Sequence, residues 1–100
     1  MMNVASDKEY LEFVLEQLSE TDGIAFRAMM GEYVIYYRGK VIGGIYDNRF
    51  LVKVTPASRA LMPGAPLETP YPGGKPMLLV EDIENREFLS ELLENTFNDL

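Results

Sequence analysis

The stretch "MMGEYVIYYRGKVIGGIYDNRFLVKV", residues Met29 to Val54, decides the fold of this chain. β-branched and aromatic residues recur in it in short runs, which are separated by Gly31, by Arg38-Gly39 and by Asp47-Asn48-Arg49. Runs of this kind, broken by turn-forming residues, are typical of strands joined by hairpins. The pattern predicts an antiparallel meander of four strands, at about 24–30, 32–38, 41–46 and 50–54.

The glycines of this stretch need separate explanations. Arg38-Gly39 is a weaker hairpin signal than Asn-Gly, so we expect a short bulged turn there with Gly39 in the left-handed region. Gly43 and Gly44 lie inside the third predicted strand, where a glycine pair allows a bulge or the close approach of another backbone. The alternative is that a terminal helix packs on this pair.

Amphipathic helices are predicted at both ends of the chain, at about 7–19 and 84–98. In both segments a helical turn of 100° per residue places the apolar residues on one side of the helix, the core arc, and the glutamates on the opposite side. Ser6 followed three residues later by Glu9 has the pattern of a capping box, in which each side chain bonds to a free backbone N–H at the helix start. Phe13 breaks the first pattern. Helical geometry places it beside the glutamates, so we expect it to be exposed.

The remaining segment connects the meander to the last helix. Thr55-Pro56 has the pattern of an N-cap followed by proline, which predicts a short helix over about 56–61. The segment "PGAPLETPYPGGKP", residues 63–76, is too rich in proline and glycine for a regular element and is predicted to be a loop. A short buried strand follows at about 77–80.

These elements predict one α+β domain over residues 1–100. We expect an antiparallel β-meander of about five strands flanked by N- and C-terminal helices, which pack on one face of the sheet. The expected order is α-β-β-β-β-(short α)-β-α.

Composition argues against most kinds of catalytic centre. The chain has 100 residues with no cysteine and no histidine, so thiolate nucleophiles, cysteine-held metals and the commonest general base are absent. We therefore expect no enzyme activity, no catalytic residues, no cofactor and no metal site. No apolar run approaches the roughly 20 residues needed to span a bilayer, and the N-terminus lacks the pattern of a secretory signal, so we expect a cytoplasmic protein.

The net charge of −7 is unevenly distributed. Residues 24–54 carry five basic and two acidic side chains, whereas residues 1–23 carry six acidic and one basic, and residues 81–100 carry seven acidic and one basic. Acidic flanks of this size repel a polyanion, so we expect no strong autonomous binding to DNA.

Tyrosines and basic residues are interleaved along the meander. This pattern resembles a stacking surface for nucleic acid, but tyrosines are also good strand residues whose rings cover a helix or a dimer partner. With Phe13 and a lysine of the proline-rich segment added, the candidate interaction surface comprises Phe13, Arg27, Tyr33, Tyr36, Lys40, Tyr46, Arg49, Lys53 and Lys75. We expect a homodimer, because Phe13 lies outside the core arc and the meander has more aromatic surface than two helices cover.

Several spaced residues of the meander carry a family resemblance. They are Arg27, Met29, Gly31, Tyr33, Arg38-Gly39-Lys40, Asp47-Asn48-Arg49-Phe50-Leu51 and Lys53. Together with the "GGKPM" segment they resemble the N-terminal domain of the TfoX/Sxy family of bacterial competence regulators. The resemblance implies an α+β domain, joined in some members to a C-terminal helical domain and acting with the cyclic-AMP receptor protein. It implies no catalytic residues, and we expect a stand-alone domain here.

Three functions are compatible with these observations. The first is a TfoX-like regulatory or adaptor domain that acts through contact with a protein partner, such as a transcription regulator. The second is a small-ligand-binding or catalytic domain that uses a cleft under the loop from Pro63 to Pro76. The third is direct nucleic-acid binding through the basic meander. A flat apolar sheet face favours protein contact, whereas a closed cavity with converging polar groups favours a ligand.

Overall fold

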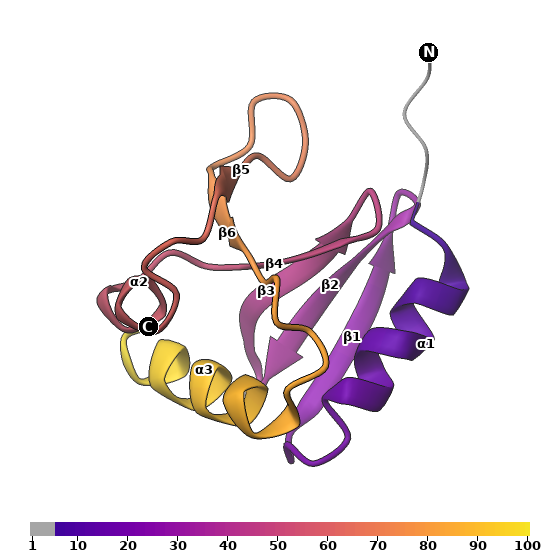
Figure 1. Ribbon diagram of the computed structural model, residues 1–100. Helices are drawn as coiled ribbons and strands as arrows, with labels where there is room; N and C mark the ends of the chain where they lie inside the picture. Colours follow the sequence, from indigo (N-terminus) through magenta and orange to yellow (C-terminus); the bar gives the residue numbers. More distant parts are fainter. Residues whose placement is uncertain (1–5) are drawn as a thin grey trace.

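A computed structural model describes residues 6–100, which contain three helices and six strands. In chain order these are α1 (Lys8–Gln17), β1 (Ile24–Met29), β2 (Glu32–Tyr37), β3 (Lys40–Tyr46), β4 (Arg49–Val52), α2 (Pro56–Leu61), β5 (Leu67–Glu68), β6 (Met77–Leu79) and α3 (Arg86–Asn98) (Figure 1). The predicted α+β class and element order are confirmed. The sheet has one strand more than expected, because the two-residue β5 forms inside the proline-rich segment predicted to be a loop.

All six strands belong to one antiparallel sheet with the spatial order β1-β2-β3-β4-β6-β5. The first four strands lie side by side in sequence order. β6 then pairs with β4, so that Leu51 lies opposite Leu79, and β5 pairs with the outer side of β6. The sheet therefore has β1 at one edge and the much shorter β5 at the other.

Two-residue turns connect the four strands of the meander. Their residues are Met30-Gly31, Arg38-Gly39 and Asp47-Asn48, and each has a positive φ, between 50° and 84°. Two consecutive residues with positive φ are characteristic of a type I′ turn, whose twist matches that of an antiparallel hairpin. The bulged turn expected at Arg38-Gly39 is therefore wrong, since Tyr37 pairs directly with Lys40 across it, whereas the expected left-handed conformation of Gly39 is confirmed by its φ of 84°.

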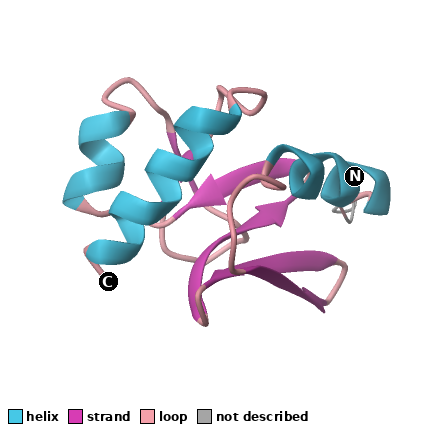
Figure 2. Ribbon diagram, turned by 90° about the horizontal axis from the view of Figure 1, so that it is seen from below, coloured by secondary structure: helices cyan, strands magenta, loops and turns pink. Residues whose placement is uncertain are grey.

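α1 and α3 lie on one face of the sheet, and α2 packs beside α3 (Figures 1 and 2). The main core lies between these helices and the sheet. It contains Leu11, Val14 and Leu18 of the first helical segment, Leu89, Leu92 and Leu93 of α3, and Ile35, Tyr37, Ile42, Ile45, Phe50, Val52, Leu78 and Val80 of the sheet. The predicted packing of both terminal helices on one face is confirmed.

Phe13 is not the exposed side chain that helical geometry predicted. It is partly buried against the core, with its ring centroid 5.9 Å from that of Tyr10. Phe13 therefore gives no support to the homodimer expected from the sequence.

A β-bulge in the middle of β3 explains one of the paired glycines. Ile35 pairs with Gly43 and Tyr36 with Val41, which leaves Ile42 as the extra residue. Both Ile42 and Gly43 consequently face the helices. A Cβ atom on Gly43 would lie 2.1 Å from the backbone oxygen of Leu51, so β3 and β4 approach too closely there for any side chain. The predicted close approach of backbone is confirmed, and helix packing on the pair is not the reason for it.

The predicted capping box at the start of α1 is absent. The N-cap residue is Asp7, whose side chain makes no capping hydrogen bond. Ser6 is buried, and its hydroxyl instead donates to the carboxylate of Glu32 at 2.6 Å. The same carboxylate accepts a hydrogen bond from the backbone N–H of Asp47 at 3.3 Å, and the Ser6 hydroxyl accepts one from Asn48 N–H at 3.1 Å. The helix start is thus held by the turn between β3 and β4.

This arrangement predicts that Glu32→Ala lowers the free energy of unfolding by about 2 kcal/mol, because the buried Ser6 hydroxyl and the backbone N–H groups of Ser6 and Asp47 all lose a charged acceptor. Glu9→Ala is the matched control and should change it by less than about 0.5 kcal/mol, since Glu9 is exposed and has no capping role. Urea unfolding followed by circular dichroism measures both. If Glu9→Ala lowered the free energy of unfolding more than Glu32→Ala does, the result would support the capping box instead.

None of the helices within residues 6–100 is long and apolar enough to cross a membrane.

Candidate functional site

The face of the sheet opposite the helices, here called the open face, carries most of the predicted surface residues. Strand pairing places Arg27, Val34, Gly44 and Leu51 in one row across it. Side chains alternate between the two faces of a strand, so Tyr36 and Tyr46 also belong to this face. Val34 and Leu51 are buried although they lie outside the main core. Part of the open face is therefore covered.

Tyr46 and the loop between β5 and β6 supply much of this cover. A Cβ atom on Gly44 would come within 2.5 Å of a ring carbon of Tyr46, so the tyrosine ring lies directly over this glycine. The ring centroid of Tyr71 is 6.2 Å from that of Tyr46, in an edge-to-face arrangement, and Pro70 is buried beside it. The pKa of the Tyr46 hydroxyl is raised above its usual value. Burial is the main cause, and the neighbouring Tyr71 and Glu32 add to it.

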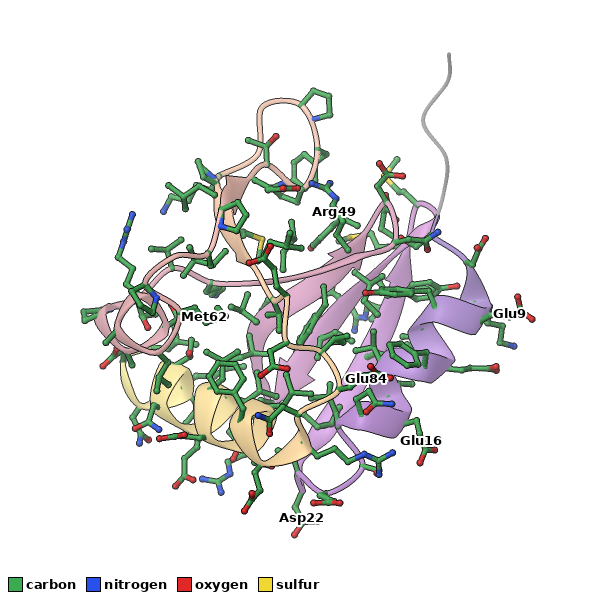
Figure 3. All side chains as sticks on the ribbon, in the orientation of Figure 1. Glu9, Glu16, Asp22, Arg49, Met62 and Glu84 are labelled. Carbon is green, nitrogen blue, oxygen red and sulfur yellow. The ribbon has the colours of Figure 1, made fainter. Side chains whose placement is uncertain are left out.

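Arg49 holds the base of this loop. Its guanidinium forms an ion pair with Glu68, donates to the backbone oxygen of Thr69 at 3.3 Å, and donates through Nε to the oxygen of Tyr46 at 3.0 Å (Figure 3). The side chain is about three-quarters buried, at 27% relative exposure. Its charge is neutralised by Glu68, so Arg49 acts as an anchor of the loop and contributes little positive potential to the surface.

A groove of about 590 Å³ lies between the open face and this loop. Its lining residues are Val41, Tyr46, Lys53, Val54, Pro70, Tyr71, Lys75, Pro76, Met77 and Leu100. The lining combines apolar side chains, two tyrosine rings and two lysines. Within the described residues, the ammonium groups of Lys53 and Lys75 form no ion pair and no hydrogen bond. The groove therefore offers positive charge beside an aromatic and apolar surface.

The nine predicted surface residues fall into separate groups. Tyr46, Lys53 and Lys75 line the groove. Arg27 and Tyr36 lie on the open face outside it, and Arg49 anchors the loop. Phe13 and Tyr33 lie on the helix side of the sheet, packed against the core.

Lys40 lies apart from these groups, next to the end of α3. Its ammonium group is 5.2 Å from the ring centroid of Phe97 and donates to the backbone oxygen of Leu100 at 3.3 Å. It therefore links the start of β3 to the C-terminal helix rather than contributing to the groove.

The nine predicted residues include three of the ten lining residues, and Tyr71 and Met77 are among those that the sequence did not single out. An aromatic residue inside a loop rich in proline and glycine was the available signal for Tyr71. The available signal for Met77 was the alternation of side chains between the two faces of a strand. Leu79 pairs with Leu51, which belongs to the open face, and Met77 lies two residues before Leu79 and so belongs to the same face.

The helix side of the molecule carries the opposite charge. Glu9, Glu12, Glu16 and Glu20 are exposed, and Figure 3 shows Glu9 and Glu16 projecting away from α1. Arg86 pairs with Glu16 at 3.3 Å and lies 3.9 Å from Glu20. Glu9 and Glu16 are thus directed away from the open face, whereas Glu32 and Asp47 line a smaller hollow of about 200 Å³ beside Tyr71. Lys53 and Lys75 are the charged side chains among the lining residues of the groove.

A second hollow of about 320 Å³ lies on the other side of the proline-rich segment. It is lined by Leu61, Met62, Gly64, Ala65, Leu79, Glu81, Asp82 and Phe88. Glu81 and Asp82 are exposed, and no group of three acidic side chains in residues 6–100 is arranged to hold a metal ion. This hollow has no basic residue and no set of polar groups that converge on one point.

Comparisons with known proteins agree with the family resemblance of the meander residues. The family described as the TfoX N-terminal domain matches residues 16–94. An uncharacterized 12.7 kDa protein in the trpE 5′ region of Spirochaeta aurantia is 35% identical over 80 residues, which cover 80% of this chain and 70% of that protein. No solved structure matches the chain. The family match spans the four-strand meander, all of the groove lining except Leu100, and most of α3, and the chain therefore belongs to the TfoX N-terminal domain family.

Proposed function

We propose that this small regulatory-type domain acts by contact with another protein, and that the groove under the β5–β6 loop receives an acidic segment of that partner. Family membership supports the regulatory role. The partner is proposed to be a transcription regulator, as in competence-type control, and the site of action is then the cytoplasm. The proposal assigns a binding role and no reaction to the domain.

The observation that carries this proposal is the presence of two unpaired lysines in an aromatic groove on a protein of net charge −7. Desolvating a lysine is costly unless an anionic group replaces the lost water, so a partner that covers Lys53 and Lys75 needs carboxylates opposite them. Tyr46 and Tyr71 add rigid rings of the kind that anchor protein interfaces. An acidic segment with apolar or aromatic side chains satisfies both features.

The charge distribution argues against duplex DNA as the partner. Arg49 is neutralised by Glu68, and Lys40 is engaged with Phe97 and Leu100 at the helix end. This leaves Arg27, Lys53 and Lys75 as the accessible cations of the open face. Non-specific binding to DNA depends on the number of phosphates neutralised, and three scattered cations on an acidic protein neutralise few.

The second candidate function is the binding of a small anionic ligand in the same groove. Its volume of about 590 Å³ supports this alternative, because it lies in the range of small-molecule pockets. The groove does not bring several polar groups to one point, however, and the aromatic and apolar share of its lining suits an extended segment better. Thermal-shift measurements with small carboxylates and phosphates separate the two functions.

The test is a fluorescence-anisotropy titration of the whole chain with a labelled peptide of alternating glutamate and phenylalanine. We expect binding that weakens with salt and falls at least about tenfold in the double variant Lys53→Glu, Lys75→Glu. Lys8→Glu is the matched control, since Lys8 is equally a surface lysine but lies on α1, and it should leave binding unchanged.

Three results would overturn the proposal. Equal losses in the double variant and in Lys8→Glu would mean that the peptide responds only to overall charge. Micromolar binding to random-sequence duplex DNA that weakens steeply with salt, and that falls in both Arg27→Ala and Lys53→Ala, would favour nucleic acid instead. A thermal shift with a small anion and no binding of the peptide would favour the second candidate function.

A further inference from the structure

The outer edge of β1 is the longest unprotected edge of the sheet. All its residues except Ile24 are exposed, and Phe26 and Met29 keep about half of their surface in solvent, at 48% and 51%. Natural proteins usually shield such an edge with proline, a bulge or several charges. β1 has no proline, no bulge and one charge, Arg27. The opposite edge is protected, because β5 has two residues and lies between Pro66 and Pro70.

Hairpin geometry shows which backbone groups of β1 face outward. Residues that flank a two-residue turn exchange both backbone hydrogen bonds, so Met29 and Glu32 bond to each other, and every second residue of β1 likewise bonds to β2. The hydrogen bond from Arg38 N–H to the oxygen of Gly23, at 2.9 Å, fits the same alternation. Ile24, Phe26 and Ala28 therefore direct their N–H and C=O groups away from the sheet. Within residues 6–100 no other strand pairs with this edge.

We propose that this edge binds a second copy of the chain, with the two β1 strands antiparallel and Phe26 opposite Phe26 of the second copy. In this register the three outward-facing residues are matched, since Ile24 then lies opposite Ala28 of the second copy. The two sheets become one continuous sheet with both helix layers on the same side. The inference is independent of the partner proposed for the groove, which lies at the far side of the open face.

Side chains on both faces favour this register over its neighbour. On the helix side, strand pairing places only Ile24, Phe26 and Ala28 at the junction, and all three are apolar. The Phe26 ring already packs edge-to-face on Tyr33, with centroids 6.1 Å apart, so the junction would extend an aromatic cluster. On the open face, Arg27 lies opposite Ala25 of the second copy. A shift by two residues in one direction places Arg27 opposite Arg27 in a closely spaced pair, which like charges disfavour. A shift by two residues in the other direction places Ala25 opposite Ala25 and leaves Ala28 without a partner in β1 of the second copy.

Light scattering and sedimentation equilibrium of the whole chain test the dimer. We expect a concentration-dependent dimer that tightens as salt is raised, because each copy carries a net charge of −7 and the edge itself has few charges. The peptide contact proposed for the groove weakens with salt, so failure of one proposal is distinguishable from failure of the other. A monomer at every concentration up to high micromolar, at low and high salt, would overturn the inference.

Two substitutions locate the interface. Phe26→Lys places two ammonium groups opposite each other and should weaken the dimer at least about tenfold. Ala28→Pro removes an outward N–H but no hydrogen bond to β2, so it should weaken the dimer while the monomer stays folded by circular dichroism. Leu67→Lys is the matched control, because Leu67 is a strand residue of similar exposure, 50%, at the opposite edge. Equal weakening by Leu67→Lys and Phe26→Lys would place the interface elsewhere.

Cross-linking tests the register. The chain has no cysteine, so a disulfide can form only at an introduced position. Phe26→Cys should form a disulfide-linked dimer under mild oxidation, since residues directly opposite in this register have Cα atoms about 5.5 Å apart, within the range that a disulfide spans. Arg27→Cys should form much less disulfide-linked dimer under the same conditions. Efficient cross-linking of Arg27→Cys with none at Phe26→Cys would overturn the proposed register.

Discussion

Replacing Gly43 by alanine is expected to destabilise the fold by about 3 kcal/mol or more, which corresponds to a fall of roughly 10–20 °C in melting temperature. The added Cβ would meet the Leu51 oxygen at 2.1 Å and the Cα atom of Val52 at 3.0 Å. Both are backbone atoms of the neighbouring strand. They cannot rotate away as a side chain would, so relief requires separation of β3 from β4 in the middle of the sheet.

Gly64→Ala is the control for this prediction, because an added Cβ there meets no atom within 4 Å and the backbone does not need a positive φ. It should change the free energy of unfolding by less than about 0.5 kcal/mol. Urea denaturation of both variants measures this change. The dependence of the free energy of unfolding on urea concentration is compared with that of the wild type. If Gly43→Ala were as stable as Gly64→Ala, the close approach of β3 and β4 would be wrong.

Leu92→Ala is expected to cost about 2–5 kcal/mol, since it removes a fully buried side chain of α3 and leaves a cavity between the helix and the sheet. Leu67→Ala makes the same chemical change in β5, where half of the side chain is exposed, and should cost less than about 0.5 kcal/mol. Thermal and urea unfolding of the pair compare the two sites. Similar losses for both variants would contradict the placement of the core between α3 and the sheet.

Much of the fold follows from local signals. The alternation of apolar and aromatic residues predicts β1 to β4 within two residues at each end, and Thr55-Pro56 predicts the start of α2, which the structure confirms with the Thr55 side chain as N-cap. The errors have tertiary causes. Ser6 has a better acceptor in Glu32 than in the first turn of its own helix. Arg38 tolerates a positive φ, and its guanidinium stacks on the ring of Tyr37, 4.9 Å from the centroid.

The candidate groove was less accessible to prediction. Tyr46, Lys53 and Lys75 were recognised as surface residues, but their association depends on two facts that a sequence does not display. One is the β3 bulge, which changes the face to which each side chain points. The other is the path of the loop between β5 and β6, which Arg49 holds through Glu68 and Thr69. Residues far apart in sequence meet here through long-range contacts that have no periodic signal.

The three two-residue turns also bear on the order of folding. Each strand from β1 to β4 pairs with its neighbour in sequence, and closing so short a connection costs little chain entropy. β6 and α3 must instead find partners across a long segment, as the pairing of Leu51 with Leu79 shows. We therefore expect the meander to form early, so that destabilising changes in its turns slow folding, whereas Leu92→Ala mainly speeds unfolding. Stopped-flow kinetics in urea would show the opposite partition if the helices formed the nucleus.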